Sequence, residues 1–180
     1  MGEPPCLNQP IKDPVVYLAL GSNLGNRAAN LTTAIQRIRE LGCVSAVSRI
    51  YESEPVGYRE QGRFYNLVLR LETGYAPEEL LVRVKRIETE MGRTSSFRNA
   101  PRTIDIDILA YDDVVLHTPE LEIPHPRMSE RSFVLLPLAE VAPDFVHPVT
   151  GKRMTELREH AETLEPAVPV GFTTQPGEQE

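Results

Sequence analysis

The sequence predicts an α+β fold in which two helices cover one face of an antiparallel sheet. Apolar and acidic residues alternate strictly over 104–108, as they do in a strand that separates two environments. Apolar residues in 31–38 and 77–91 recur instead at the spacing of a helix. The predicted order is strand, helix, strand, strand, helix, strand, which is the βαββαβ arrangement of ferredoxin-like domains.

The first half of the chain supplies three strands and one helix. The strands are expected over 15–20, 44–51 and 64–71. The polar turn 21–26 leads from the first strand into the helix, whose buried side chains are expected to be Leu31, Ile35 and Ile38. Gly42 is expected to cap this helix, because glycine adopts the left-handed conformation that ends many helices. A loop rich in proline and glycine is expected over 53–62.

The second helix is expected to begin at Pro77, because proline is favoured in the first turn of a helix. Glu78 and Glu79 suit the positive end of the helix dipole there. Gly92 is expected to end the helix. The alternating strand follows, and beyond it we expect an extended pair near 114–116 and 121–123 and a short helix around 129–141.

Two strands sort their side chains by face. In 64–71, one face carries Tyr65, Leu67, Leu69 and Leu71, and the other carries Phe64, Asn66, Val68 and Arg70. In the alternating strand, the apolar face carries Ile104, Ile106 and Ile108. If the leucine and isoleucine faces meet the helices, the open face of the sheet presents Phe64, Asn66, Asp105 and Asp107. An aromatic ring, an amide and two carboxylates on one surface indicate a ligand-binding site.

Length predicts a single domain over 15–160, with a C-terminal extension beyond the βαββαβ core. Residues 1–14 hold four prolines and few apolar residues, so a flexible leader is expected there. Residues 161–180 are rich in proline, glycine, glutamine and glutamate toward their end and are expected to form a disordered tail.

Composition and charge argue against several classes of protein. The net charge of −7 argues against general nucleic-acid binding, which requires a basic surface. No apolar stretch approaches the length of a membrane span, and the N-terminus lacks the pattern of a secretory signal. Cys6 and Cys43 do not have metal-ligand spacing, so a reducing, cytoplasmic location is expected.

Asp105 and Asp107 stand one strand repeat apart on the same face of the alternating strand. Their like charges repel unless solvent or a cation intervenes, and burial would require a counter-charge. Magnesium takes oxygen ligands and shares them with substrate phosphates. An Asp-x-Asp match alone is equally compatible with two solvated carboxylates on a half-exposed strand. Arg102, just upstream, favours the metal interpretation because arginine suits a polyphosphate.

Basic residues are concentrated ahead of this strand. Between 83 and 102 the chain has a local net charge of +4, with the basic residues Arg83, Lys85, Arg86, Arg93, Arg98 and Arg102 and the acidic residues Glu88 and Glu90. A small polyanion explains such a concentration better than a nucleic-acid duplex does. For Arg83 and Arg86, the solvated face of a helix is the preferred explanation.

Two further segments are candidates for a chemical role. Residues 21–25 lie between a strand and a helix, where phosphate loops also lie, but they lack the lysine of a Walker motif. We interpret them as a tight turn beside the site. His125 is flanked by Pro124 and Pro126, which restrict its backbone, as a residue that contacts a ligand would require. No residue pattern indicates covalent catalysis.

Five motifs occur in an order that resembles one family. They are Gly21-Ser22-Asn23-Leu24-Gly25, Phe64-Tyr65-Asn66, Gly92-Arg93, the run from Pro101 to Ile108, and Pro124-His125-Pro126-Arg127-Met128. Together they resemble 6-hydroxymethyl-7,8-dihydropterin pyrophosphokinase, an enzyme of folate biosynthesis. The resemblance covers about 15–157, which is nearly everything outside the two ends.

The resemblance implies transfer of pyrophosphate from ATP to the hydroxymethyl group of the pterin, with release of AMP. It implies that Asp105 and Asp107 hold two Mg²⁺ ions, and that Arg93 and Arg102 neutralise charge on the transferred group. The implied ATP-binding residues are Lys85, Glu88, His125 and Arg131. The implied pterin-binding residues are Ser53, Glu54, Val56, Phe64, Asn66 and Phe133.

The chain departs from common family members at several positions. Ser95 replaces a basic residue, Asn99-Ala100 replaces Trp-Gly, Glu54 replaces a proline and Phe64 replaces a tyrosine. The loop from Arg93 to Arg102 is also one residue shorter than in some relatives. None of these changes removes a proposed metal ligand or either main arginine. Since 92–100 has Phe97 as its only large apolar residue, we expect this stretch to form a mobile lid.

Two alternative functions remain open. Another Mg-dependent nucleotidyl or phosphoryl transferase could use the same Asp-x-Asp strand, and formation of AMP rather than ADP or free pyrophosphate would distinguish the two enzymes. A non-catalytic ferredoxin-like module that binds RNA or a regulatory ligand fits less well, because the chain is acidic and lacks an aromatic-basic RNA motif. The expected partners are the small-molecule substrates alone, with neither nucleic acid nor a membrane, and a monomer is expected.

Overall fold

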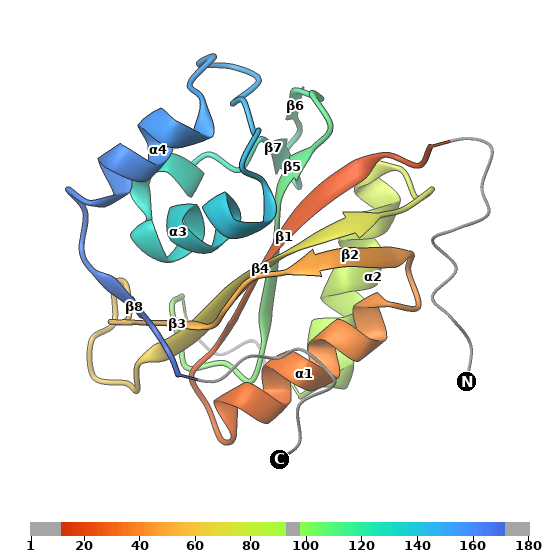
Figure 1. The fold of residues 1–180 in the computed structure, drawn as a ribbon. Coiled ribbons are helices and arrows are strands. Elements are labelled where there is room, and N and C mark those ends of the chain that lie inside the picture. The colour runs from red at the N-terminus through yellow and green to blue at the C-terminus, as the bar shows by residue number, and fades with distance from the viewer. Residues whose placement is uncertain (1–11, 93–97, 172–180) are drawn as a thin grey trace.

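The chain folds around one antiparallel sheet with helices on both faces (Figure 1). This computed structural model describes residues 12–92 and 98–171. The elements in order are β1 (Val15–Ser22), α1 (Arg27–Ile38), β2 (Cys43–Val47), β3 (Tyr51–Ser53), β4 (Phe64–Glu72), α2 (Pro77–Glu90), β5 (Asp105–Tyr111), β6 (Leu116–His117), β7 (Glu122–Ile123), a short 3₁₀ helix (Met128–Glu130), α3 (Ser132–Val141), α4 (Met154–Ala161) and β8 (Ala167–Pro169).

The strand order is β5-β1-β4-β3-β8, and β2 pairs with β4 beside β3. Every pairing within this sheet is antiparallel. β1 and β4, which are the first and third strands of the βαββαβ pattern when β2 and β3 count as its second strand, lie in the centre of the sheet. The predicted fold class is therefore confirmed, and β6 with β7 forms the small extended pair expected after it.

Helices α1 and α2 cover the face predicted from the leucine and isoleucine alternation. The core on this side contains Leu67, Leu69 and Leu71 of β4 and Ile106 and Ile108 of β5. The helices contribute Leu31, Ala34, Ile35, Ile38, Leu80, Val84 and Ile87. Burial of these side chains supplies most of the driving force for packing the helices on the sheet.

The opposite face is only partly covered, by α3 and α4 (Figure 1). Val68 of β4 and Leu109 of β5 pack there with Leu135 and Leu138 of α3. The register of β5 against β1 shifts between Tyr17 and Leu18, which makes Leu109 an extra residue in its strand. Such a bulge redirects side chains. The two acidic residues of β5 precede it, on the part of the face that α3 leaves open.

The ends of α1 and α2 agree with the predictions except at Gly42, whereas the helix expected around 129–141 is a 3₁₀ helix at Met128–Glu130 followed by α3 from Ser132. Asn26 caps α1, because its side chain accepts a hydrogen bond from Ala29 N at 3.0 Å. Pro77 begins α2 as expected. The cap residue after α1 is Arg39, not Gly42. A side-chain carbon at Gly42 would lie 2.2 Å from Glu72 O, so this glycine permits close packing of two backbones.

The strand expected over 44–51 is two strands, β2 and β3, which both pair with β4. Ser48 lies in the gap between them. It donates its N–H to Val68 O at 2.9 Å, and its Oγ accepts from Val68 N at 3.0 Å. Val68 N thus donates to the Ser48 hydroxyl and not to a backbone carbonyl, which interrupts the β ladder between β4 and its neighbour at this point.

The C-terminal part of the chain differs from the expectation over 162–171. Within the segment expected to be a disordered tail, β8 pairs with β3, with Ala167 opposite Ser53. The backbone N–H of Val170 donates to Ile50 O at 2.8 Å, and Ser132 Oγ donates to Glu165 O. These hydrogen bonds fix the segment, and its polar composition did not reveal them.

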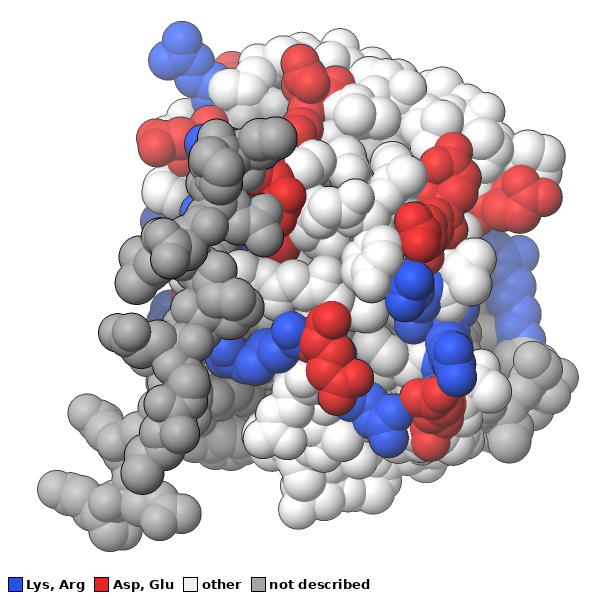
Figure 2. Space-filling model, turned by 90° about the vertical axis from the view of Figure 1, so that its right-hand side faces the viewer, with Lys and Arg blue, Asp and Glu red and all other residues white. Residues whose placement is uncertain are grey.

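Exposed ion pairs lie along the surface of α2. Arg83 pairs with Glu79 at 3.3 Å, and Arg86 pairs with Glu90 at 2.9 Å. Figure 2 shows one side of the molecule on which basic and acidic side chains alternate instead of gathering by sign. The interpretation of Arg83 and Arg86 as part of a solvated helix face agrees with these pairs. In the part of the chain that the structure describes, no helix is long and apolar enough to cross a membrane.

Candidate functional site

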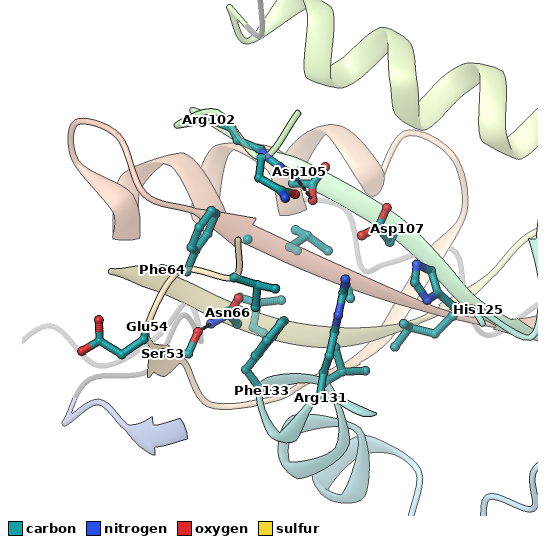
Figure 3. A pocket seen from close by; sticks show the side chains of 18 of the residues that line it. Ser53, Glu54, Phe64, Asn66, Arg102, Asp105, Asp107, His125, Arg131 and Phe133 are labelled. Carbon is teal, nitrogen blue, oxygen red and sulfur yellow. Dashed lines mark hydrogen bonds and ion pairs between the residues drawn. The ribbon is translucent and has the colours of Figure 1, made fainter. Parts of the chain in front are cut away.

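A pocket opens on the part of the second sheet face that α3 does not cover (Figure 3). Strands β1, β4 and β5 contribute to its lining, together with segments 53–61, 99–102 and 125–134. Its lining includes Gly21, Ser53, Glu54, Val56, Gln61, Phe64, Asn66, Asn99, Arg102, Asp105, Asp107, His125, Arg131 and Phe133. Residues distant in sequence thus form one site.

The acidic wall of the pocket consists of Asp105 and Asp107, which point off the same face of β5 (Figure 3). Arg102 Nη1 donates to Asp105 Oδ2 at 2.8 Å, and both of these side chains are about four-fifths buried. Burial raises the pKa of the Asp107 carboxyl, and the negative charge of Asp105 raises it further. A cation bound between the two carboxylates would relieve this repulsion.

Lys85 and Glu88 of α2 hold the edge of β5 behind this wall. Ile106, the residue between the two aspartates, donates its N–H to Glu88 Oε1 at 2.7 Å. Its carbonyl oxygen accepts a hydrogen bond from Lys85 Nζ at 3.2 Å. Lys85 Nζ also contacts Glu88 Oε1 at 3.1 Å and lies 3.9 Å from Asp107 Oδ1. Glu88 and Lys85 therefore bind the backbone N–H and the backbone carbonyl of Ile106, respectively.

His125 lies beside the carboxylates, where its backbone N–H donates to Leu109 O at 2.8 Å. Its Nδ1 accepts a hydrogen bond from Arg127 N at 3.1 Å, which assigns the proton of the neutral ring to Nε2. Burial lowers the pKa of the imidazole to about 4, and the positive charge of Arg131 acts in the same direction. The ring is therefore neutral at pH 7 and can donate a hydrogen bond without carrying charge.

Arg131 extends from the start of α3 toward Asp107 and His125 (Figure 3). Burial lowers the pKa of its guanidinium, whereas the charge of Asp107 raises it. Because the ordinary value for arginine is so high, the group stays charged. The guanidinium carbon also lies 5.7 Å from the ring centroid of Phe133. Arg131 thus joins the charged wall of the pocket to its aromatic wall.

The opposite wall carries two aromatic rings and an amide. Phe64 and Phe133 both line the pocket, and neither is fully buried. Asn66 is buried, and its Nδ2 donates to Ser53 Oγ at 2.8 Å and to Tyr51 O at 3.2 Å. Among the described residues its Oδ1 accepts no hydrogen bond, so this oxygen can accept one from a ligand. A flat heterocycle with a donor edge fits such a wall.

Glu54 and Val56 complete this side of the pocket, and both are exposed. Glu54 pairs with Arg63 at 2.8 Å, so its carboxylate is held on the outer rim. Gly21 of β1 lies next to this wall, where a side-chain carbon would be in ordinary contact with Phe64 Cδ1 at 3.5 Å.

The structure brings eleven of the predicted site residues to this pocket: Ser53, Glu54, Val56, Phe64, Asn66, Arg102, Asp105, Asp107, His125, Arg131 and Phe133. Lys85 and Glu88 lie behind β5 and outside the lining. Arg93 and Ser95, with most of the expected lid, lie outside the described residues. Gln61 and Asn99 also line the pocket and were not predicted. No periodicity marks them, since both stand in loops.

The donor set of the pocket limits how it could hold a metal. Within residues 12–92 and 98–171, no group of three or more histidine, cysteine, aspartate or glutamate side chains could hold an ion. Asp105 and Asp107 alone suit Mg²⁺, which keeps water ligands and takes others from substrate phosphates. Burial, and after it the charge of Asp105, raises the pKa of Asp107, and a cation bound there would favour the charged carboxylate.

Comparison with known proteins identifies relatives over most of the chain. The model of the 7,8-dihydro-6-hydroxymethylpterin-pyrophosphokinase family matches residues 17–143. The 2-amino-4-hydroxy-6-hydroxymethyldihydropteridine pyrophosphokinase of Aquifex aeolicus is 42% identical over 151 residues, which cover 84% of this chain and 94% of the relative. The folic acid synthesis protein FOL1 of Dictyostelium discoideum is 48% identical over 143 residues, 78% of this chain and 22% of that protein.

Solved structures share the fold. The Plasmodium falciparum HPPK-DHPS wild type with pteroate aligns with a TM-score of 0.67 at 20% identity, over 85% of this chain and 43% of that chain. At this identity the likeness concerns the fold alone. This chain spans less than half of the Plasmodium protein and about a fifth of the Dictyostelium protein, whereas it spans nearly all of the Aquifex enzyme.

Proposed function

The chain belongs to the 7,8-dihydro-6-hydroxymethylpterin-pyrophosphokinase family, and we infer that it transfers pyrophosphate from ATP to 6-hydroxymethyl-7,8-dihydropterin in folate biosynthesis. The hydroxymethyl oxygen attacks the β-phosphorus of ATP and loses its proton. The bond from that phosphorus to the oxygen shared with the α-phosphate breaks, and AMP leaves. Transfers of this kind need little covalent help from protein, so alignment and charge stabilisation account for most of the catalysis.

The observation that supports this function most directly is the division of one pocket into two chemically different walls. One wall carries Arg102, Arg131 and two carboxylates, which suit a metal-bound triphosphate. The other carries two phenylalanine rings and the Asn66 amide, which suit a pterin. The arrangement allows both substrates to bind side by side, as a direct transfer requires.

On the charged wall, Asp105 and Asp107 would hold Mg²⁺, with two ions as the proposed number. Bound there, Mg²⁺ would neutralise charge on the triphosphate and polarise its phosphoryl oxygens. Arg102 pairs with Asp105 in this structure, and it would exchange that partner for a phosphate oxygen once a cation holds the carboxylate. Arg93 is proposed to act with Arg102 on the transferred group.

Four residues are proposed for the rest of the ATP. Arg131 would contact phosphate oxygens as a permanent cation, and neutral His125 would donate a hydrogen bond from Nε2. Lys85, whose side chain is 41% exposed, remains accessible to a nucleotide. Glu88 is buried, and its carboxylate would act on the nucleotide by holding Lys85 and β5 in place.

For the pterin, we assign stacking to Phe64 and Phe133 and a hydrogen bond to Asn66 Oδ1. Ser53 would act mainly by orienting the Asn66 amide, since its Oγ accepts from Nδ2 at 2.8 Å. Glu54 and Val56 form the rim of this subsite. The exposed carboxylate of Glu54 would accept hydrogen bonds from the amino edge of a pterin in exchange for its pairing with Arg63.

The decisive test is product analysis with ATP, Mg²⁺ and the reduced hydroxymethylpterin. Stoichiometric AMP and a diphosphorylated pterin support the proposal. ADP with a monophosphorylated pterin, or free pyrophosphate with a nucleotidylated product, would instead assign the chain to another class of Mg-dependent transferase. Omission of Mg²⁺ should abolish AMP formation, and an ATP analogue with a non-hydrolysable bond between the α- and β-phosphates should bind without turnover.

We further propose that the chain acts as a cytoplasmic monomer, with residues 15–160 as its catalytic domain. The support for these domain bounds is that the residues lining the pocket all fall between Ala19 and Val134. Light scattering across a range of protein concentrations tests the oligomeric state. A dimer at concentrations at which the enzyme is fully active would contradict the proposal.

A further inference from the structure

Three loops around the pocket meet at one hydrogen-bonded junction, which consists of Asn23, Gln61 and the backbone groups that they bind. The first loop is the turn between β1 and α1. The second is the segment between β3 and β4, which carries Glu54 and Val56. The third is the segment before β5, which carries Arg102. Asn23 stands in the first of the five sequence motifs, but neither Asn23 nor Gln61 was selected from the sequence as a candidate site residue.

Asn23 fixes the backbone of Arg102 at two points. The backbone N–H of Asn23 donates to Arg102 O at 3.1 Å, and Arg102 N donates to Asn23 Oδ1 at 2.8 Å. Asn23 is 7% exposed, so water competes little for these hydrogen bonds. Because both backbone groups of Arg102 are held, the direction in which its guanidinium leaves the chain is restricted.

Gln61 links the Asn23–Arg102 contact to the segment between β3 and β4, on the proposed pterin side. Its Oε1 accepts a hydrogen bond from Asn23 Nδ2 at 2.8 Å. Its Nε2 donates to Asn99 O at 2.9 Å and to Tyr58 O at 2.6 Å. One amide therefore binds all three loops, and its two hydrogen-bond donors are both used on backbone carbonyls.

A second contact joins the same two loops. The side chain of Asn99 packs against Gly57, where a side-chain carbon would lie 2.4 Å from Asn99 Nδ2. Both residues have positive φ, +83° at Gly57 and 61° at Asn99. A side chain at Gly57 would displace the Asn99 side chain as well as strain the backbone. The relative position of the loops is set by local contacts between them, outside the two hydrophobic cores.

The junction lies between the two proposed halves of the site. Val56 and Gln61 line the pocket from one loop, and Asn99 and Arg102 line it from the other. A junction that only stabilised the fold would not need to join these two loops, because each is continuous with a strand of the sheet. Small displacements at this point would move Arg102 relative to a bound pterin, and errors of about 1 Å can reduce turnover by about 100-fold.

We propose that Asn23 and Gln61 are positioning residues, which align Arg102 with the loop that bounds the pterin. This inference rests on the proposed function, because it takes Arg102 as the arginine that acts on the transferred group. Neither amide contacts the reacting atoms. Both act through the backbone groups that they hold.

The test compares Gln61→Met and Gln61→Ala with wild type and with Glu60→Ala. Methionine preserves the length of the side chain but not its hydrogen bonds. Glu60 is an exposed neighbour whose side chain accepts a hydrogen bond from the Tyr58 hydroxyl at 3.4 Å. We expect both Gln61 variants to lose about 10- to 100-fold in kcat at saturating substrates. Binding of an ATP analogue with Mg²⁺, the melting temperature and the activity of Glu60→Ala should change little.

A second variant tests the link between the two amides. Asn23→Asp keeps a side-chain oxygen that accepts from Arg102 N. It loses the amide N–H groups that donate to Gln61 Oε1 and to Gly62 O. If the amides act as a unit, the double variant Asn23→Asp with Gln61→Met should lose less activity than the product of the two single losses. Independent, multiplicative losses would overturn the coupling.

The outcomes separate this inference from the proposed function. A wild-type protein that forms no AMP overturns both. An active wild type with normal kcat in Gln61→Met overturns only the junction. If kcat falls in Gln61→Ala but not in Gln61→Met, the side chain acts by packing and the positioning role is overturned. The same holds if kcat falls only in proportion to the melting temperature.

Discussion

The backbone N–H of Ile106 donates to Glu88 Oε1 at 2.7 Å, so the strand residue between the two proposed metal ligands is anchored by a buried carboxylate of α2. The same carboxylate contacts Lys85 Nζ at 3.1 Å. β5 is the edge strand of its sheet, and α2 therefore completes the hydrogen bonding of Ile106 where no further strand does so. The position of the carboxylates depends on a helix that carries neither of them.

Glu88→Ala should destabilise the fold by roughly 3 kcal/mol, because it removes a buried carboxylate from its N–H donor and from Lys85. Glu88→Gln should cost less, since an oxygen remains for Ile106. Urea denaturation provides the measurement. Glu90→Ala, on the same helix, is the control. Its side chain is 42% exposed and pairs with the surface residues Arg37 and Arg86, so a loss below about 1 kcal/mol is expected. Equal losses at the two positions would contradict the anchoring role.

Asp107→Asn should lower turnover by roughly 1,000-fold while leaving the free energy of unfolding unchanged or higher. The pKa of Asp107 is raised mainly by burial and then by Asp105, so the folded protein disfavours the charged form and a neutral amide relieves that cost. Asp113→Asn, at an exposed residue after the same strand, should retain full activity. Titration with Mg²⁺ in the presence of an ATP analogue should show weaker metal binding in Asp107→Asn alone. Wild-type turnover in that variant would refute the metal assignment.

Phe64→Ala should weaken pterin binding by roughly 1–3 kcal/mol, the range found for stacking of bases on aromatic side chains. Binding of an ATP analogue should not change, because Phe64 lies on the wall away from the carboxylates. Phe64→Tyr keeps the ring and should bind pterin nearly as well as wild type. Calorimetric titration of each ligand separately measures these effects. An equal loss for both ligands would mean that the ring supports the fold of the pocket and does not contact the pterin.

His125 should make the free energy of unfolding fall as the pH is lowered from about 6.5 toward about 4. In this window the unfolded chain binds a proton that the folded chain excludes, because burial lowers the folded-state pKa. His125→Gln should therefore show a smaller loss of stability between these pH values than wild type. His160→Gln, at an exposed histidine, should behave like wild type. Parallel pH profiles for wild type and His125→Gln would show that the ring is not held neutral.

Sequence patterns predicted the parts of the fold that follow a regular period. The alternation over 104–108 predicted which side chains of β5 meet the helices, and those residues lie in the core as expected. The family and fold class are likewise confirmed. By contrast, the break at Ser48 was missed, because it depends on a hydroxyl that bonds to Val68 of another strand. The docking of β8 was missed for the same reason, since its partner strand is more than 100 residues away.

The candidate site shows the same division. Asp105, Asp107 and Phe64 could be selected because they stand at polar or aromatic positions of predicted strands. Gln61 could not, because its importance in the structure comes from hydrogen bonds to Asn23 and Asn99, each 38 residues away. A turn glutamine has no periodic signal, and only the geometry of the meeting loops distinguishes it from its neighbours.

The short pairing of β8 with β3 has a consequence for solubility. Without it, β3 would end the sheet with unpaired backbone groups, and such edges recruit strands from other molecules. Pro169 lies in β8 and offers no N–H, which makes β8 itself a poor template. The family match ends at residue 143, so this protection is supplied by a segment beyond it. A chain shortened to residue 161 should keep its pocket residues and yet self-associate as its concentration rises.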